Sequence, residues 1–226
     1  GNDFFGEVDE KLAIDAIRAS IDAGVNMVDT AAAYGLDGAS EKVVAKALKG
    51  LRDKVVLATK VGTLRIFGEY VNCLNTKIMQ HELEDSLRRL ETDYIDVYYI
   101  HWPDFNNSID AALEMMVKFK KEGKIRAIGV SNFNTELIQK AIDIADISVV
   151  QPPMNLLNRS SIENGIMAKC RENGVGVITY GSLGGGILTG KMEKPVTGGK
   201  ELRSAFYSFY DEPMWSKCQK FLDVLR

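Results

Sequence analysis

The regular alternation of short apolar runs with amphipathic segments constrains the fold of this chain more than any other feature. Runs rich in β-branched residues are typical of buried strands, and they occupy residues 25–29, 54–60, 95–101, 125–131, 148–152 and 174–182. Segments with helical spacing of apolar residues predict helices at 9–23, 40–49, 78–91, 108–122, 135–145, 163–173 and 214–226. The stretch between 60 and 78 is expected to be a loop, and Ser40 is the expected N-cap of its helix.

These strands are apolar on both faces and are separated by helices, a pattern that predicts a parallel sheet covered by helices. Repeated strand–helix units favour an α/β fold of the (β/α)8 TIM barrel type over a doubly wound open sheet, which is the structural alternative. No repeat or low-complexity segment divides the chain, so residues 1–226 are expected to form a single barrel domain. Because a closed barrel needs eight strands, we expect this domain to be incomplete at both ends, lacking the first and last strand units.

The composition argues against several classes of function. The chain has 46% hydrophobic and 26% charged residues and a net charge of −3, without the basic stripe that nucleic-acid binding requires. No apolar run approaches the ~20 residues of a membrane helix, and the acidic N-terminus lacks the basic start of a secretory signal. The three cysteines are far apart and form neither a zinc motif nor a disulfide framework. We therefore expect a cytoplasmic protein with no nucleic-acid partner, no membrane partner and no metal.

Polar side chains end three successive predicted strands. Asp29 ends the first, Lys60 ends the next and His101 ends the one after that, while Tyr34 lies on the loop directly after Asp29. In parallel barrels the chemistry collects at the C-terminal ends of the strands, so these four side chains are expected to converge. Each residue alone would more often be a helix cap, a solvated side chain or a structural histidine. The coincidence of all four favours a functional site.

The chemistry of these four residues fits a proton donor. A free phenol, with a pKa near ~10, gives up its proton reluctantly at neutral pH. A nearby Lys60 ammonium would stabilise the phenolate of Tyr34, and Asp29 would keep Lys60 charged and in place. His101 would direct or polarise a carbonyl oxygen beside Tyr34. The combination predicts a site that protonates an oxygen while another group attacks its carbon.

Five ordered motifs, "DTAAAYG", "LATKVG", "IHWPD", "GVSNF" and "QPPMNLLNR", resemble those of the aldo-keto reductase family over almost the whole chain. The resemblance implies a (β/α)8 barrel and an NADP-dependent oxidoreductase that reduces an aldehyde or ketone to an alcohol by hydride transfer. It places the family's catalytic tetrad on Asp29, Tyr34, Lys60 and His101, with Tyr34 as general acid. The implied partner is a small carbonyl substrate, and Trp102 is expected to form a wall of its pocket.

The same resemblance implies which residues hold NADP(H). Ser131, Asn132 and Gln151 match the family's hydrogen bonds to the nicotinamide carboxamide, a task that suits hydroxyl and amide groups. Tyr180 matches the aromatic residue that stacks on the nicotinamide ring. The segment "YGSLGGGILTGK" matches the family's pyrophosphate loop, whose small residues let backbone N–H groups approach phosphate. The remaining cofactor-binding candidates in and after this loop are Gly181, Ser182, Leu183, Gly184, Lys191 and Arg203.

Other patterns in the sequence do not support rival chemistry. "GGILTGK" lacks the Ser or Thr that a P-loop needs after its lysine, "HELED" is not the HExxH of a zinc protease, and no GxGxxG follows a strand. The alternative to a reductase is a cofactor-binding regulatory barrel with little turnover, like the potassium-channel β subunits of the same family. A non-redox barrel enzyme is a third possibility. Neither the individual carbonyl substrate nor the oligomeric state follows from the sequence.

Overall fold

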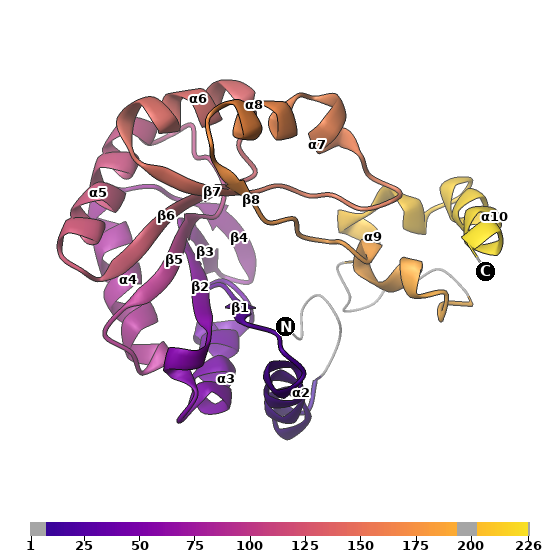
Figure 1. Ribbon diagram of the computed structural model, residues 1–226, viewed down its shortest axis with the longest axis horizontal. Coiled ribbons are helices and arrows are strands. Elements are labelled where there is room, and N and C mark those ends of the chain that lie inside the picture. Colours follow the sequence, from indigo (N-terminus) through magenta and orange to yellow (C-terminus); the bar gives the residue numbers. More distant parts are fainter. Residues whose placement is uncertain (1–7, 194–202, 226) are drawn as a thin grey trace.

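Six parallel strands form one curved sheet in the computed structural model, which describes residues 8–193 and 203–225 (Figure 1). The strand order is β1-β2-β5-β6-β7-β8, and each neighbouring pair is parallel. The strands are β1 (Met27–Asp29), β2 (Val56–Val61), β5 (Ile95–Ile100), β6 (Ile125–Ser131), β7 (Ile147–Gln151) and β8 (Gly176–Val177). The six predicted strands and their parallel arrangement are thus confirmed, and within the described residues β1 and β8 each pair on one side only.

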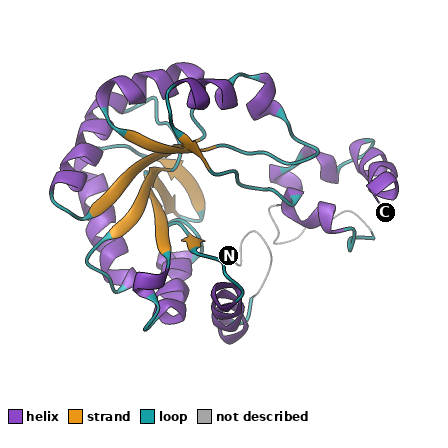
Figure 2. Cartoon of the chain, in the orientation of Figure 1, coloured by secondary structure: helices purple, strands orange, loops and turns teal. Residues whose placement is uncertain are grey.

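Helices cover the convex side of this sheet, as Figure 2 shows. The described α-helices are α2 (Glu10–Asp22), α3 (Ala39–Leu48), α4 (Thr76–Leu90), α5 (Ile109–Lys121), α6 (Thr135–Ile144), α7 (Ser160–Glu163), α8 (Ile166–Glu172), α9 (Arg203–Phe206) and α10 (Met214–Leu225). Short 3-10 helices are η1 (Leu36–Gly38), η2 (Arg52–Lys54), η3 (Gly184–Thr189) and η4 (Ser208–Tyr210). The predicted helix 214–226 is therefore α10, except that residue 226 lies outside the described residues.

Polar side chains fix where several of these helices begin. Asn75, Ser108 and Asn134 each accept hydrogen bonds from backbone N–H groups in the first turns of α4, α5 and α6. The prediction for Ser40 is wrong. Helix α3 begins one residue earlier, after Gly38 at φ 64°, and the Ser40 hydroxyl instead accepts a hydrogen bond from Thr30 Oγ1 at 2.8 Å.

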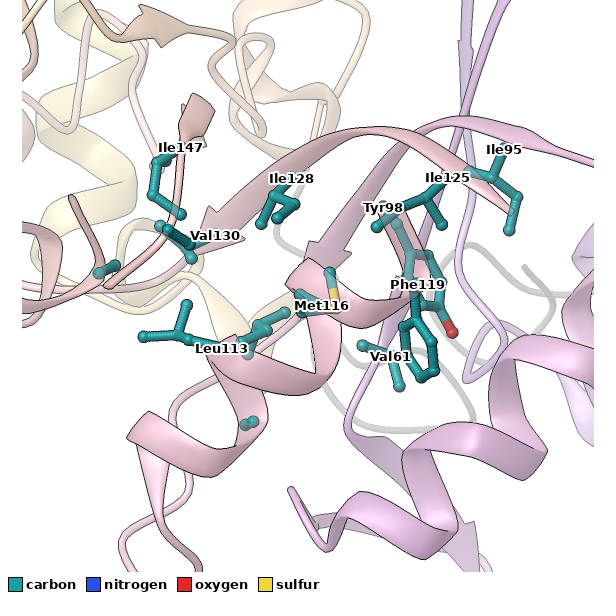
Figure 3. Packing of buried hydrophobic residues seen from close by; sticks show 14 of the residues in the cluster. Val61, Ile95, Tyr98, Leu113, Met116, Phe119, Ile125, Ile128, Val130 and Ile147 are labelled. Carbon is teal, nitrogen blue, oxygen red and sulfur yellow. The ribbon is translucent and has the colours of Figure 1, made fainter. Parts of the chain in front are cut away.

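The main core lies between the sheet and its helices (Figure 3). Helix α5 presents Leu113, Met116 and Phe119 to the strands, and all three are fully buried. The ring of Phe119 lies 6.4 Å from that of Tyr98 on β5, centroid to centroid. Burying each such side chain stabilises the fold by ~1.5–3 kcal/mol, so this layer is the principal source of stability for the sheet.

The opposite, concave face of the sheet holds a small second cluster that positions the site. Its buried members are Ala58, Val97, Tyr99 and Val149. Because side chains alternate between the two faces of a strand, the next concave-facing residue of β2 after Ala58 is Lys60. The same alternation brings Asp29, His101, Ser131, Gln151 and Tyr180 to that face, at or just beyond the C-terminal ends of their strands.

Three predicted elements differ from the structure. The loop between 60 and 78 contains an antiparallel hairpin, β3 (Thr63–Ile66) and β4 (Glu69–Asn72). Its two-residue turn has positive φ at both Phe67 and Gly68, the backbone of a type I′ turn. The predicted strand 174–182 shrinks to the two residues of β8, and the predicted helix 163–173 is divided between α7 and α8 at Gly165, which has φ 79°.

Aromatic side chains build a separate cluster near the C-terminal end. Tyr207 and Phe209 stack with ring centroids 4.9 Å apart, and Tyr210 and Trp215 extend the group into α10. Ile187 from η3 is fully buried against them. In Figure 1 the helices α9 and α10 lie beyond the loops that follow β7 and β8. Because Ile187 packs in the aromatic cluster, the glycine-rich segment around η3 has a hydrophobic support of its own.

Candidate active site

An ion pair between a buried lysine and a partly exposed aspartate lies at the base of the site. Lys60 Nζ lies 2.6 Å from Asp29 Oδ2 and donates a second hydrogen bond to the carbonyl of Thr30 at 2.8 Å. The Lys60 side chain is 1% exposed, whereas that of Asp29 is 32% exposed. A buried ammonium group is tolerated only when it is paired and hydrogen-bonded, so Asp29 and Thr30 fix the position of Lys60.

Tyr34 lies directly beside this ion pair. Its ring centre is 5.1 Å from Lys60 Nζ, and its ring meets that of His101 edge-on with centroids 5.6 Å apart. Ala31 and Ala33, both buried, leave the loop before Tyr34 compact enough to pack against the sheet. The structure therefore brings together the four side chains that were expected to converge.

His101 is a neutral imidazole at physiological pH. Burial, with a smaller contribution from the positive charge of Lys60, lowers its pKa from 6.5 to about 3. A neutral imidazole offers one N–H donor and one acceptor nitrogen. His101 can therefore donate a hydrogen bond to a carbonyl oxygen without being a charged acid.

Hydroxyl and amide groups line the wall next to the tetrad. Ser131 Oγ donates to the carbonyl of Gln151 at 2.8 Å, and Gln151 Nε2 donates to Asp29 Oδ1 at 3.3 Å. Asn132 Nδ2 donates to the carbonyl of His101 at 2.9 Å, while Asn132 Oδ1 accepts from Tyr180 Oη at 2.7 Å. These bonds fix the orientation of each polar group against the neighbouring strand.

A cleft of about 1030 Å³ opens above these groups. Tyr34, His101 and Trp102 line one part of it, together with the hydroxyl and amide groups described above. The full set of lining residues is Tyr34, Gly35, Thr63, Tyr70, Asn72, His101, Trp102, Ser131, Asn132, Gln151, Tyr180, Gly181, Ser182, Leu183, Gly185, Gly186, Arg203, Phe206 and Tyr207. Asp29 and Lys60 are not among these lining residues.

The glycine-rich segment also lines the cleft. Gly185 and Gly186 have φ values of 65° and 112°, a left-handed backbone that side chains would strain. A Cβ added to Gly185 would lie 2.7 Å from the ring of Tyr207, so the chain passes this ring closely. Arg203 Nη1 donates to the carbonyl of Gly185 at 3.3 Å and lines the cleft.

Two of the predicted cofactor residues do not line the cleft. Lys191 is exposed just after η3, and Gly184 is buried, with its carbonyl accepting a hydrogen bond from Tyr210 Oη at 3.3 Å. Gly181, Ser182 and Leu183 do lie on the cleft surface, as expected.

Five cleft residues lie outside every motif and candidate that the sequence offered. Thr63, Tyr70 and Asn72 come from the hairpin, and Phe206 and Tyr207 come from the aromatic cluster. Thr63 Oγ1 donates to Asn72 Oδ1 at 3.1 Å across the two strands. The apolar–polar alternation of "TLRI" before Phe-Gly was the one available signal, because it is the pattern of a hairpin arm.

The buried carboxyl group of Glu82 supports the end of β2. Both oxygens of Glu82 accept from the N–H of Gly62, at 3.2 and 3.4 Å. Burial raises the pKa of Glu82 from 4.5 to about 8. Gly62 joins β2 to the hairpin, so Glu82 fastens the hairpin to the strand that carries Lys60.

Two kinds of feature were not found in the part of the chain that the structure describes. None of its helices has the length and apolar character needed to cross a lipid bilayer. No group of three or more His, Cys, Asp and Glu side chains there has the arrangement of a metal site.

Comparison with known proteins links this geometry to one family. A family model described as "Aldo/keto reductase family" matches residues 1–226. The chain is 42% identical over 207 residues to the aldo-keto reductase YhdN of Bacillus subtilis, covering 90% of this chain and 62% of that protein. It is 34% identical over 218 residues to the NADH-specific methylglyoxal reductase of Escherichia coli, covering 89% and 66% respectively. The chain thus spans slightly less than two thirds of the length of both relatives.

Solved structures share the fold. The glycerol dehydrogenase of Gluconobacter oxydans superimposes with a TM-score of 0.84 at 33% identity, over 97% of this chain and 68% of that one. An aldo/keto reductase from Klebsiella pneumoniae in complex with NADP and acetate gives a TM-score of 0.70 at 35% identity, over 81% and 61%. These likenesses confirm the predicted TIM-barrel class of the fold.

Proposed function

The chain belongs to the aldo/keto reductase family, and we propose that it forms a single barrel domain of an NADP(H)-dependent oxidoreductase that reduces an aldehyde or ketone to an alcohol. The observation that carries this proposal is the placement of Tyr34 between the Lys60–Asp29 ion pair, whose lysine is buried, and the neutral His101, at the wall of a large cleft. Its substrate class is a small carbonyl compound.

The residues around the cleft fit a nicotinamide cofactor. Ser131, Asn132 and Gln151 offer hydroxyl and amide groups for the carboxamide, and Tyr180 offers an aromatic face beside them. Gly185, Gly186 and the Arg203 cation would hold the phosphates, because small residues allow close backbone approach. When bound, the cofactor supplies the hydride. Solved relatives from Klebsiella pneumoniae are complexes with NADP and NADPH, which supports this assignment.

Tyr34 is the proton donor in this proposal. As negative charge develops on the carbonyl oxygen of the substrate, the Tyr34 phenol transfers its proton to that oxygen. The Lys60 ammonium stabilises the phenolate that remains, and Asp29 holds the ammonium in place. Since each of these groups is fixed before substrate arrives, little reorganisation is needed at the moment of transfer.

His101 and Trp102 position the carbonyl group. The neutral imidazole of His101 donates its N–H to the carbonyl oxygen, which aims that oxygen at the phenol beside it. Trp102 and the hairpin residue Tyr70 provide aromatic walls that exclude water from the reacting atoms. An effective catalyst therefore requires the barrel strands and the hairpin together.

Two measurements test the proposal. Titration of the protein with NADPH and NADH, followed by cofactor fluorescence, is expected to give saturable binding, and the preference between them is informative because one relative is NADH-specific. Steady-state oxidation of the bound cofactor with simple aldehydes is expected to give repeated turnover. Cofactor binding without turnover would support a regulatory barrel, and absence of binding would support a non-redox enzyme.

A further inference from the structure

The outer face of β2 carries a buried polar group directly behind Lys60. Thr59 precedes Lys60 in the strand, so its side chain points away from the cleft, toward the helices. Its hydroxyl is fully buried and donates to Glu41 Oε1 at 2.7 Å. A hydroxyl at this position in an otherwise apolar helix–sheet layer requires such a partner.

Glu41 is itself fully buried and fully partnered. Its second oxygen accepts from Arg89 Nε of α4 at 2.6 Å, and the Glu41 side chain is 0% exposed. A charge-assisted hydrogen bond of this kind is short and directional. Glu41 therefore has a fixed orientation between helix α4 and strand β2.

Glu41 also stands next to the loop that carries Tyr34. It lies in the first turn of α3, and the N–H of the preceding Ser40 donates to the carbonyl of Tyr34 at 3.1 Å. Gly38, at φ 64°, allows this loop to pass over Arg89, because a Cβ there would come within 2.3 Å of Arg89 Nε. The loop thus rests on the same guanidinium group that holds Glu41.

We propose that Glu41 is a positioning residue that sets the separation between Tyr34 and Lys60. Its bond to Thr59 fixes α3 against the strand of Lys60, and the start of α3 fixes the backbone of Tyr34. The catalytic consequence rests on the roles proposed above for Tyr34 and Lys60. A shift of about 1 Å in Tyr34 relative to Lys60 would misalign the phenol with the carbonyl oxygen and weaken the stabilisation of its phenolate, and is expected to cost a large factor in rate.

A comparable network elsewhere in the fold provides a matched control. Thr92 Oγ1 accepts from Arg52 Nε at 3.1 Å and donates to the carbonyl of Tyr94 at 3.1 Å. It precedes β5, at the end of the sheet opposite the cleft. Thr92→Val therefore removes a structural hydroxyl of the same type without touching the path from Thr59 to Tyr34.

The variants Thr59→Val and Thr59→Ser isolate the proposed role. Removing the Glu41 carboxylate itself would leave Arg89 without its buried partner and endanger the fold, whereas valine keeps the shape of threonine. Thr59→Val is expected to lower kcat about tenfold or more, with KM and the Kd for NADPH within about twofold of wild type. Thr59→Ser keeps the hydroxyl and is expected to have a kcat close to that of wild type. Thr92→Val, the control, is expected to have the wild-type kcat as well.

An NMR measurement on protein with isotope-labelled tyrosine makes the test independent of turnover. The Tyr34 ring signal, assigned by its loss in Tyr34→Phe, is expected to shift in Thr59→Val and to return in Thr59→Ser. If Thr59→Val has the same kcat and the same Tyr34 signal as Thr92→Val, the positioning role of Glu41 is overturned. An increase in KM with an unchanged kcat in Thr59→Val would overturn it as well. A shifted signal in a protein that reduces no carbonyl compound would uphold the positioning role and refute the proposed function.

Discussion

Lys60 Nζ lies 2.6 Å from Asp29 Oδ2, although 31 residues separate them in the sequence. The contact exists because β1 and β2 are adjacent parallel strands whose C-terminal ends meet at one rim. Lys60 is almost fully buried and Asp29 is partly exposed, so Asp29 keeps contact with solvent while it pairs with the lysine. The proposed chemistry of Tyr34 depends on this balance.

Tyr34→Phe is expected to lower kcat by roughly 10²–10⁴-fold, because the ring is retained and the transferable proton is lost. The Kd for NADPH is expected to change little. Steady-state rates with a simple aldehyde, together with a fluorescence titration, check both statements. A variant that reduces aldehydes at the wild-type rate would show that another group donates the proton.

Lys60→Met is expected to lower kcat across the pH range, because the phenolate that forms as the proton leaves Tyr34 loses its neighbouring positive charge. Asp29 stays partly exposed, so the variant leaves no fully buried charge unpaired. Lys42→Met, which removes an exposed lysine paired with Asp37 at 2.6 Å, is the matched control. Steady-state rates measure this effect, and an unchanged kcat for Lys60→Met would place the Lys60 ammonium outside the electrostatic reach of the phenol.

Glu82→Gln is expected to stabilise the protein at alkaline pH. The pKa of Glu82 is raised to about 8 in the fold, so between pH 4.5 and about 8 the folded protein binds more protons than the unfolded chain, and stability falls as pH rises. The loss accumulates at about 1.4 kcal/mol per pH unit, to a few kcal/mol. The side-chain carbonyl oxygen of glutamine can still accept from the Gly62 N–H, and because glutamine does not ionise, the variant does not lose this stability as pH rises.

Urea unfolding at pH 5 and pH 9 measures this effect, with the exposed Glu114→Gln as control. The free energy of unfolding of Glu82→Gln is expected to exceed that of wild type at pH 9 but not at pH 5. Equal pH dependence in the two proteins would mean that Glu82 is ionised in the fold at neutral pH.

His101 is expected to have the opposite effect on the pH dependence of stability. Its pKa is lowered from 6.5 to about 3, so its contribution to stability is complete above pH 6.5 and is lost as pH falls toward 3. The free energy of unfolding of His101→Asn, measured with urea, is expected to fall less than that of wild type as the pH is lowered over this range.

In the kinetics, the wild-type pH profile of kcat/KM is expected to show no imidazole titration between pH 5 and pH 8. A pH-dependent change of kcat/KM in this range that disappears in His101→Asn would contradict the assignment of His101 as neutral.

The strands and the four converging side chains could be predicted because both follow from local patterns. Alternating apolar runs mark the strands, and parallel topology then places Asp29, Lys60 and His101 at one rim. The hairpin was missed because its turn is Phe67-Gly68, whereas Asn-Gly is the strong sequence signal for such turns. Its cleft residues were missed with it.

The support behind the site was not predictable for a different reason. Glu41 lies in "SEKVVAKAL", where a glutamate ordinarily marks the solvated side of a helix. Its burial depends on Arg89, which is 48 residues away in the sequence and meets it only through the packing of α3 against α4. Pairings of this kind are a property of the tertiary structure rather than of any local pattern.

Transfer of an isotopic label tests the central proposal most directly. The protein is mixed with NADPH that carries deuterium at the transferable position of the nicotinamide, together with an aldehyde, and the alcohol product is analysed by mass spectrometry. The proposal predicts one deuterium on the former carbonyl carbon, formed in repeated turnovers by wild type and far more slowly by Tyr34→Phe. Unlabelled product, or no alcohol at all from protein saturated with NADPH, would contradict it.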